Sequence, residues 1–319
     1  MQIVSVKRAR PLSVTQQHLL TAIVTLLSEG EVQPRDGRLR ILDIGCGDGQ
    51  LIDHLHSGLS AAFPTIEIEI HGFDIGEQGY NDGSQLEVAT LSLTKRYPWI
   101  DWRARLSLFS DSEPWQYPTD FFDIAISNQV IEHVKELPFF LAELRRCLSA
   151  EGASVHLFPL SNCIVEAHCQ TPFAHWIHDF DRRSSWIALL SRLGIGAYRR
   201  HRKVLGHQSV REHAVETSKY IQCWTRYRDF AAISEACATA DLAASNGLTK
   251  GLFVAKLRML LRLAPLVRYR RSPIAGLDWL YFAIGRFLSS STLVIKPMSY
   301  DIGRRIAAEK AASALREAA

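Results

Sequence analysis

Hydrophobic and polar positions alternate with two different periods through the first 160 residues. Short apolar or strictly alternating runs, typical of strands, occupy residues 39–45, 65–75, 102–110, 121–128 and 153–160. Between them, segments with apolar residues on one side, typical of amphipathic helices, lie at 49–62, 83–96 and 136–148. Strands that alternate with helices in this way predict βαβ units and an α/β fold built on a mostly parallel sheet.

The alternation stops near residue 160. The predicted elements that follow are helices at 184–194, 227–240, 251–263 and 276–288, and a β-branched run at 291–297 that could return to the same sheet as a late strand. A charged, alanine-rich tail looks helical, and an amphipathic helix is predicted near the N-terminus. We therefore predict a core over residues 1–160 and a helical elaboration over residues 161–319.

Composition and charge limit the kinds of protein and partner. Of the 319 residues, 47% are hydrophobic and 22% are charged, which is enough apolar material for a substantial core. The net charge of +4 hides an asymmetry, since residues 1–150 hold 13 Lys and Arg against 20 Asp and Glu, whereas residues 151–319 hold 24 against 13. The basic half favours an anionic partner, although a solvated basic face explains it equally well.

The cysteines and the N-terminus point to a cytoplasmic protein. Six cysteines are present without the paired spacing of a metal site, so we expect reduced thiols and no bound metal. The basic N-terminus precedes an apolar run that polar residues 15–18 interrupt, and no cleavage site of small residues follows. This pattern does not fit a secretory signal.

Three glycines, Gly45, Gly47 and Gly49, follow the first predicted strand in the stretch ILDIGCGDGQ. Glycine at this density indicates positive φ angles or a close approach of the backbone to a ligand. The spacing differs from the G-x-G-x-x-G of dinucleotide sites, and no Lys-Ser/Thr follows as in a phosphate-binding loop. An open α/β sheet binds ligands beyond the carboxyl ends of its strands, where this turn falls.

The stretch LDIGCGDG resembles the first motif of class I S-adenosylmethionine-dependent methyltransferases. The resemblance implies a Rossmann-like fold, S-adenosyl-L-methionine as cofactor, and a core match over about residues 35–160. Further matches follow in order: Asp74 for the ribose hydroxyls, Asp111 with Ser112 for the adenine amino group, Asn128 near the methionine portion, and Asp43 near the cofactor's cationic groups. Alternatively, Asp74 and Asp111 could cap helices, and Glu132 with His133 could orient a loop.

The acceptor site is expected after the fifth strand. The stretch from Glu166 to Trp176 has the pattern E-x-H…P-x-x-H-W and resembles a branch of the type 11 methyltransferases. Methyl transfer to an oxygen or a nitrogen needs alignment and, for some acceptors, a base, a role that suits histidine at neutral pH. The candidate catalytic residues are therefore His168, His175 and His133, each of which could equally be a hydrogen-bonding loop residue. We predict a small-molecule, sugar or lipid-linked acceptor.

Residues 250–288 mix lysines and arginines with Leu, Phe and Trp, and they contain no uncharged apolar run of membrane-spanning length. Such a segment could contact an anionic membrane surface peripherally, cover a lipid-linked acceptor, or simply cap the sheet.

Two other functions stay open. The basic half suggests an RNA methyltransferase, but the Asn/Asp-Pro-Pro-aromatic tetrad is missing where SNQV stands and no RNA-binding module is evident, so nucleic acid is an unlikely partner. A scaffold without catalysis is disfavoured because it would not need the glycines together with the three aspartates.

Overall fold

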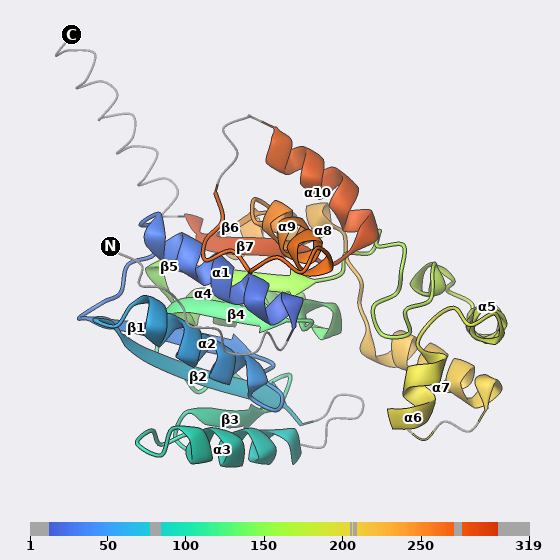
Figure 1. The fold of residues 1–319 in the computed structure, drawn as a ribbon, viewed down its shortest axis with the longest axis horizontal. Coiled ribbons are helices and arrows are strands. Elements are labelled where there is room, and N and C mark those ends of the chain that lie inside the picture. Colours follow the sequence, from blue (N-terminus) through green and yellow to red (C-terminus); the bar gives the residue numbers. More distant parts are fainter. Residues whose placement is uncertain (1–12, 77–83, 205, 207–208, 271–275, 299–319) are drawn as a thin grey trace, which may run out of the picture.

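A computed structural model describes residues 13–76, 84–204, 206, 209–270 and 276–298, and its centre is a seven-stranded sheet (Figure 1). The strand order is β3-β2-β1-β4-β5-β7-β6. The strands are β1 (Arg38–Ile44), β2 (Glu67–Ile75), β3 (Leu106–Phe109), β4 (Phe122–Asn128), β5 (Leu148–Phe158), β6 (Leu242–Ser245) and β7 (Ser291–Pro297). Strands β1 to β5 pair in parallel, whereas β7 is antiparallel to both β5 and β6.

Helices cover both faces of the sheet, because successive side chains of the central strands enter cores on opposite sides. In β1, Ile41 faces the core with α1 (Val14–Ser28), α2 (Gln50–Ala62), α3 (Ser84–Arg96) and α9 (Thr249–Leu260). Its neighbour Leu42 faces the core with α4 (Leu137–Cys147), α8 (Phe230–Thr239) and Phe282 of α10 (Leu277–Leu288). The predicted Rossmann-like, mostly parallel sheet with helices on both faces and a helical C-terminal elaboration is thereby confirmed.

Three further helices lie to one side of the sheet in Figure 1: α5 (Phe180–Arg192), α6 (Tyr198–Val204) and α7 (Val210–Trp224). Helices α5 and α7 share a small apolar cluster with the segment before α5, formed by Cys169, Ala174, Ile187, Ala214 and Ile221. This cluster fixes α5 against α7, while the chain before α5 runs back towards the sheet. How the chain divides into domains stays a prediction.

Several elements differ from the sequence-based expectation. No element was predicted for α6, α7 or β6, which contribute few apolar positions to the main cores. The third strand is shorter than predicted, because Trp102 is buried in the core ahead of it and the chain turns there before Leu106. The N-terminal helix is buried throughout residues 18–27 rather than on one face, because it packs against the sheet, α2 and α9. The predicted helical tail lies outside the described residues.

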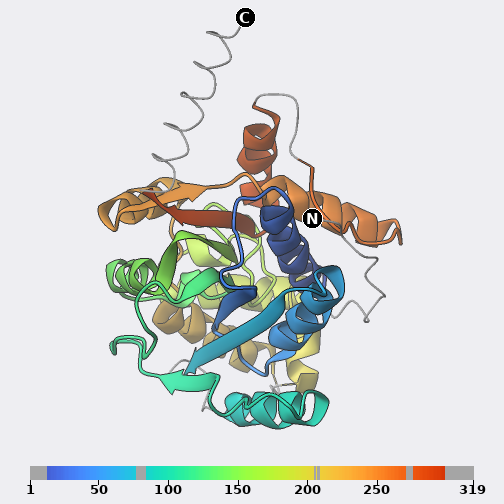
Figure 2. The ribbon, with the colours of Figure 1, turned by 90° about the vertical axis from the view of Figure 1, so that its left-hand side faces the viewer.

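The two ends of the sheet carry different surfaces. Helix α3 lies at the β3 end and α10 at the opposite end, beyond α9 and β7, in both views (Figures 1 and 2). No helix among the described residues combines the length and the apolar character that crossing a bilayer requires.

Candidate functional site

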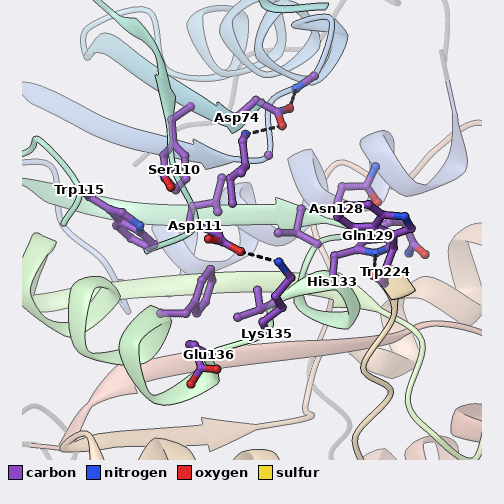
Figure 3. A pocket seen from close by; sticks show the side chains of 18 of the residues that line it. Asp74, Ser110, Asp111, Trp115, Asn128, Gln129, His133, Lys135, Glu136 and Trp224 are labelled. Carbon is purple, nitrogen blue, oxygen red and sulfur yellow. Dashed lines mark hydrogen bonds and ion pairs between the residues drawn. The ribbon is translucent and has the colours of Figure 1, made fainter. Parts of the chain in front are cut away.

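A cavity of about 340 Å³ opens at the carboxyl ends of β1, β2 and β4 (Figure 3). Its lining includes Gly45, Gly47, Asp74, Gln85, Ser110, Asp111, Trp115, Asn128, Gln129, His133, Lys135, Tyr220 and Trp224. The volume lies within the range of small-molecule sites, which are about 300 to 1,000 Å³. Segments that are far apart in the sequence therefore share one concave site.

All three glycines of the turn have positive φ angles, but they serve two purposes. Gly45 (φ 71°) and Gly47 (φ 50°) line the cavity, and a Cβ on Gly45 would stand 2.5 Å from a methyl carbon of Val130. Gly49 (φ 75°) begins α2 outside the lining, and a Cβ there would stand 2.9 Å from that of Ala89 in α3. The first two glycines allow the backbone to form the turn that lines the cavity, and the third allows α2 and α3 to pack closely.

Two aspartates, Asp74 and Asp43, lie next to this turn. Asp74, at the end of β2, accepts hydrogen bonds from the backbone N–H groups of Gly47 and Ile75, both at 2.7 Å. Asp43 is 1% exposed, and neither of its carboxylate oxygens has a hydrogen-bond partner among the described residues. Burial, reinforced by the charge of Asp74, raises the pKa of the Asp43 carboxyl well above its usual value. Asp43 is not among the residues that line the cavity, so a cationic ligand there would interact with its charge without direct contact.

The other predicted cofactor residues are Asp111, Ser112 and Asn128. The Asp111 carboxylate pairs with Lys135 Nζ at 3.0 Å, and both residues line the cavity (Figure 3). The Asn128 side chain also lines it, and its Oδ1 is buried without a partner in the described part of the chain. Ser112 lies outside the lining, where its hydroxyl is 3.4 Å from that of Ser110, which does line the cavity.

A histidine pair forms where the segment after β4 meets the segment after β5. The Nε2 atoms of His133 and His168 are 3.2 Å apart. His133 Nδ1 donates to the carbonyl of Trp224 at 2.7 Å, and His168 Nδ1 donates to the Glu166 carboxylate at 2.7 Å. Burial lowers the pKa of His133 to about 4, whereas the hydrogen bond and charge of Glu166 outweigh burial and raise the pKa of His168.

Two buried glutamates accompany the pair and differ in their partners. Glu166 accepts hydrogen bonds from the backbone N–H groups of His168 and Cys169 and from the hydroxyl of Tyr227. Burial alone would raise the pKa of Glu166, but the hydrogen bond and charge of His168 and these other donors lower it to about 2. Glu132 is 1% exposed with both carboxylate oxygens unpaired among the described residues, and burial raises its pKa to about 8.

The turn after β4 places Glu132 and His133. Gln129 adopts a left-handed conformation (φ 62°) that is uncommon for a residue with a side chain. Its backbone N–H donates to the carbonyl of Leu157 at 2.7 Å, and its side chain donates to the Ser290 hydroxyl at 3.1 Å. A short 3₁₀ helix, η1 (Ile131–His133), follows and turns His133 to the cavity wall.

The structure brings only two of the three candidate histidines together. His175 lies outside the cavity lining, with Nε2 3.1 Å from the Ser161 carbonyl and its ring 4.6 Å from that of Tyr227. Sequence reasoning also missed the aromatic wall formed by Tyr220 and Trp224. Both residues lie on α7, which was not predicted, so no pattern in the sequence assigned them to the site.

The family of the chain follows from its sequence match over this same region. A family model described as a methyltransferase domain matches residues 15–204. The chain belongs to this methyltransferase family. Its fold and sequence are those of a class I S-adenosylmethionine-dependent methyltransferase, with S-adenosyl-L-methionine as the cofactor of the domain.

Curated relatives match the methyltransferase over part of their length. The malonyl-[acyl-carrier protein] O-methyltransferase of Halorhodospira halophila is 27% identical over 149 residues, which are 47% of this chain and 43% of that protein. The ubiquinone biosynthesis O-methyltransferase of Mesorhizobium japonicum is 30% identical over 120 residues, 38% of this chain and 40% of that protein. The chain thus spans about two fifths of the length of the curated relatives that it matches.

Solved structures with a similar arrangement include two geranyl diphosphate methyltransferases. One, in complex with SAM, has 14% sequence identity and a TM-score of 0.45, and covers 89% of this chain and 84% of its own. The other, the C-methyltransferase from Streptomyces coelicolor A3(2), has 12% identity and a TM-score of 0.42, and covers 92% and 90%.

Proposed function

We propose that this protein binds S-adenosyl-L-methionine in the 340 Å³ cavity and transfers the methyl group to an oxygen or nitrogen of a small-molecule, sugar or lipid-linked acceptor. The observation that carries the proposal is the meeting of Gly45, Gly47, Asp74, Asp111 and Asn128 around one cavity, in the order of the family resemblance. The matched relatives are named O-methyltransferases, which supports an oxygen acceptor over a nitrogen.

In this proposal each of the cofactor residues interacts with a different part of S-adenosyl-L-methionine. Asp74 accepts both ribose hydroxyls, and Asp111, assisted by Ser112, accepts from the adenine amino group. The unpaired carboxylate of Asp43 attracts the positive charges of the cofactor from behind Gly45 and Gly47. The free Oδ1 of Asn128 is available to the cofactor's ammonium group. Gly49 contributes through the packing of α2 against α3.

The acceptor is proposed to lie against His133, Tyr220 and Trp224, which form the wall beyond the cofactor residues. Methyl transfer is an in-line displacement, so the main work of this wall is alignment. We propose proton removal through the histidines, with His133 at the cavity, His168 in contact with it, and His175 behind Tyr227. An imidazole nitrogen that carries no hydrogen can accept a proton from a hydroxyl or an amine.

The test of cofactor binding is calorimetric titration of the purified chain with S-adenosyl-L-methionine. We expect binding in the micromolar range, with a loss of affinity of at least about 100-fold in Asp74→Ala, because two hydrogen bonds to a charged group are removed at about 1.5 to 3 kcal/mol each. Asp101→Ala is the matched control, since Asp101 also accepts from two backbone N–H groups but lies outside the cavity lining. Absence of binding by the wild type would contradict the proposed enzyme function and favour a scaffold without catalysis.

We further propose that residues 250–288 contact an anionic membrane surface. The exposed large apolar side chains of this segment include Leu257, Leu260, Leu261, Trp279, Ile284 and Leu288. Arg262, Arg268 and Arg270 are exposed beside them. A second cavity of about 320 Å³, lined in part by Lys250, Arg268 and Arg270, is suited to a phosphate headgroup. Apolar side chains flanked by arginines favour an interfacial position.

Co-sedimentation with vesicles that contain an anionic phospholipid tests this contact. We expect binding that weakens as salt rises, and about a tenfold weaker partition for Trp279→Ala. Trp99→Ala is the control, because Trp99 is 74% exposed and Trp279 65% exposed. Trp99 follows α3 in the sequence and Trp279 belongs to α10, and these two helices lie at opposite ends of the sheet (Figure 2). Equal losses in both variants, or binding that ignores salt, would contradict this docking surface.

A further inference from the structure

The face between η1 and the segment after β5 holds three potential metal ligands that the cofactor site does not use. One ligand atom from each of Glu132, His133 and His168 lies within 4.8 Å of the other two. The two Nε2 atoms alone are 3.2 Å apart. Two imidazole nitrogens on one tetrahedral zinc ion, each at 2.0 to 2.1 Å from it, would be ~3.3 Å apart. The separation in the structure therefore already suits a shared cation.

The hydrogen bonds of the two rings point both Nε2 lone pairs into the same space. A backbone carbonyl can only accept, so His133 Nδ1, at 2.7 Å from the Trp224 carbonyl, must carry its hydrogen. The Glu166 carboxylate accepts from two backbone N–H groups and the Tyr227 hydroxyl, and an ionised carboxylate only accepts, so His168 Nδ1 donates to it. In neutral rings both Nε2 atoms are then without hydrogen and face each other, an arrangement that requires a cation or a proton between them.

These Nδ1 partners are the ones that metal-binding histidines use. Such histidines commonly donate the second ring N–H to a carboxylate or a backbone carbonyl, which fixes the tautomer and the ring orientation. Here His168 Nδ1 donates to the Glu166 carboxylate, and His133 Nδ1 donates to the carbonyl of Trp224. Glu166 is itself held by the N–H groups of His168 and Cys169 and by Tyr227. The rings of His133 and His168 are therefore already held by the hydrogen bonds that metal-binding histidines use.

Glu132 provides the independent observation. Its side chain is 1% exposed, and neither oxygen has a hydrogen-bond partner among the described residues. An ionised carboxylate in this position is costly unless a cation or a donor satisfies it. Among the described residues no lysine or arginine pairs with it, whereas one ring nitrogen of each of His133 and His168 lies within 4.8 Å of one of its carboxylate oxygens.

We propose that Glu132, His133 and His168 bind one divalent first-row transition metal ion, with zinc as the reference ion. Two imidazoles and one carboxylate suit zinc, iron and manganese better than magnesium or calcium, which prefer oxygen ligands alone. Three protein ligands leave a coordination position open, as in catalytic rather than structural zinc sites. Because His133 lines the cavity, an ion bound to it would lie beside the proposed acceptor wall. With a metal bound, the Nε2 lone pairs of His133 and His168 would be used for coordination.

The test is zinc binding by the untagged full chain after treatment with a chelator, measured by calorimetry without S-adenosyl-L-methionine. Cobalt(II) is the second probe, because its visible absorption reports the coordination of the site. We expect one zinc ion per chain, with affinity at least 100-fold lower in His168→Ala and Glu132→Gln. In Glu166→Gln we expect a loss of 10- to 100-fold, as for other partners of metal ligands. His175→Asn, which removes a histidine of the same segment, should bind zinc like the wild type. Circular dichroism verifies that each variant is folded.

Binding that is equal in wild type, His168→Ala and Glu132→Gln would overturn the proposal, and it would assign a shared proton to the His133–His168 pair. An equal loss in His175→Asn would also overturn it, because that residue is not a ligand. Zinc binding requires neither cofactor nor acceptor, so its failure and the failure of methyl transfer are separate results. A methyltransferase whose turnover survives chelation, with no zinc bound, would keep the proposed function and lose the metal site.

Discussion

The two walls of the cavity are built in different ways. The proposed cofactor wall consists of residues at the carboxyl ends of strands that are adjacent in the sheet: Asp43 in β1 and Gly45 directly after it, Asp74 in β2, and Asn128 in β4. The acceptor wall consists of residues from irregular segments and from α7, joined by hydrogen bonds between residues 35 to 91 positions apart. The first wall is a property of sheet topology, whereas the second depends on how two loops pack.

The largest expected effect tests whether the glycine turn is specific to the cofactor wall. Gly45→Ala is expected to weaken cofactor binding by more than 100-fold, because the new Cβ would stand 2.5 Å from Val130 and displace the cavity wall. Gly37→Ala is the matched control, since Gly37 has nearly the same φ, 72° against 71°, and nothing lies within 4 Å of its Cβ. Both variants should lose about 1 to 2 kcal/mol of stability to backbone strain. Calorimetry and thermal unfolding separate the two effects, and equal binding by both variants would show that the turn tolerates a side chain.

The second prediction separates the two walls by function. His168→Ala should lower kcat by about 100-fold, with an acceptor found by screening, and leave the affinity for S-adenosyl-L-methionine unchanged, because His168 contacts His133 rather than the cofactor residues. Asp74→Ala should mainly weaken the affinity for S-adenosyl-L-methionine and have the smaller effect on kcat. Steady-state kinetics and calorimetry on both variants measure the difference. Unchanged turnover and an unchanged pH profile in His168→Ala would remove this residue from the mechanism.

The third prediction concerns the core behind the cofactor wall. Complete burial lowers the pKa of His156, on β5, to about 3 from the usual 6.5. The unfolded chain therefore binds an additional proton between these values, so the free energy of unfolding falls as the pH falls below 6.5. From pH 7 to pH 5 this residue alone should cost about 2 kcal/mol.

His156→Gln should reduce the pH dependence of urea unfolding by that amount, even if the variant is less stable at pH 7. The exposed His178 provides the control, since His178→Gln should leave the dependence as in the wild type. A pH dependence that persists unchanged in His156→Gln would place its origin elsewhere in the protein.

The smallest expected effect is at the adenine end of the cofactor wall. Asp111→Ala should weaken the affinity for S-adenosyl-L-methionine by about tenfold, the value of one hydrogen bond at the upper end of the usual range. Asp111→Asn should restore most of it, since the amide oxygen still accepts. Lys135→Met, which removes the ion pair at 3.0 Å, should change affinity by threefold at most. A loss in Lys135→Met as large as that in Asp111→Ala would show that the ion pair, rather than the carboxylate, matters.

The success of the sequence-based predictions also differs between the two walls of the cavity. The period of apolar residues predicted the parallel sheet, and the glycine turn predicted where its ligand site lies. Tyr220 and Trp224 were not found, because no helix was predicted over α7, whose buried apolar residues Ala214 and Ile221 pack in a small separate core with α5. Glu132 was considered only as a residue that orients a loop, since a single buried carboxylate leaves no periodic signal in the sequence.

The sequence by itself determined the cofactor wall, because strands that run in parallel bring their carboxyl ends to one edge, so residues that end these strands meet without further information. Only the tertiary structure decided the acceptor wall. The left-handed turn at Gln129 and the hydrogen bonds of Glu166 set the course of two irregular segments, and these interactions place His133 beside His168 and Glu132 close to both. Contacts of this kind depend on the packing of side chains from distant segments, which no local pattern encodes.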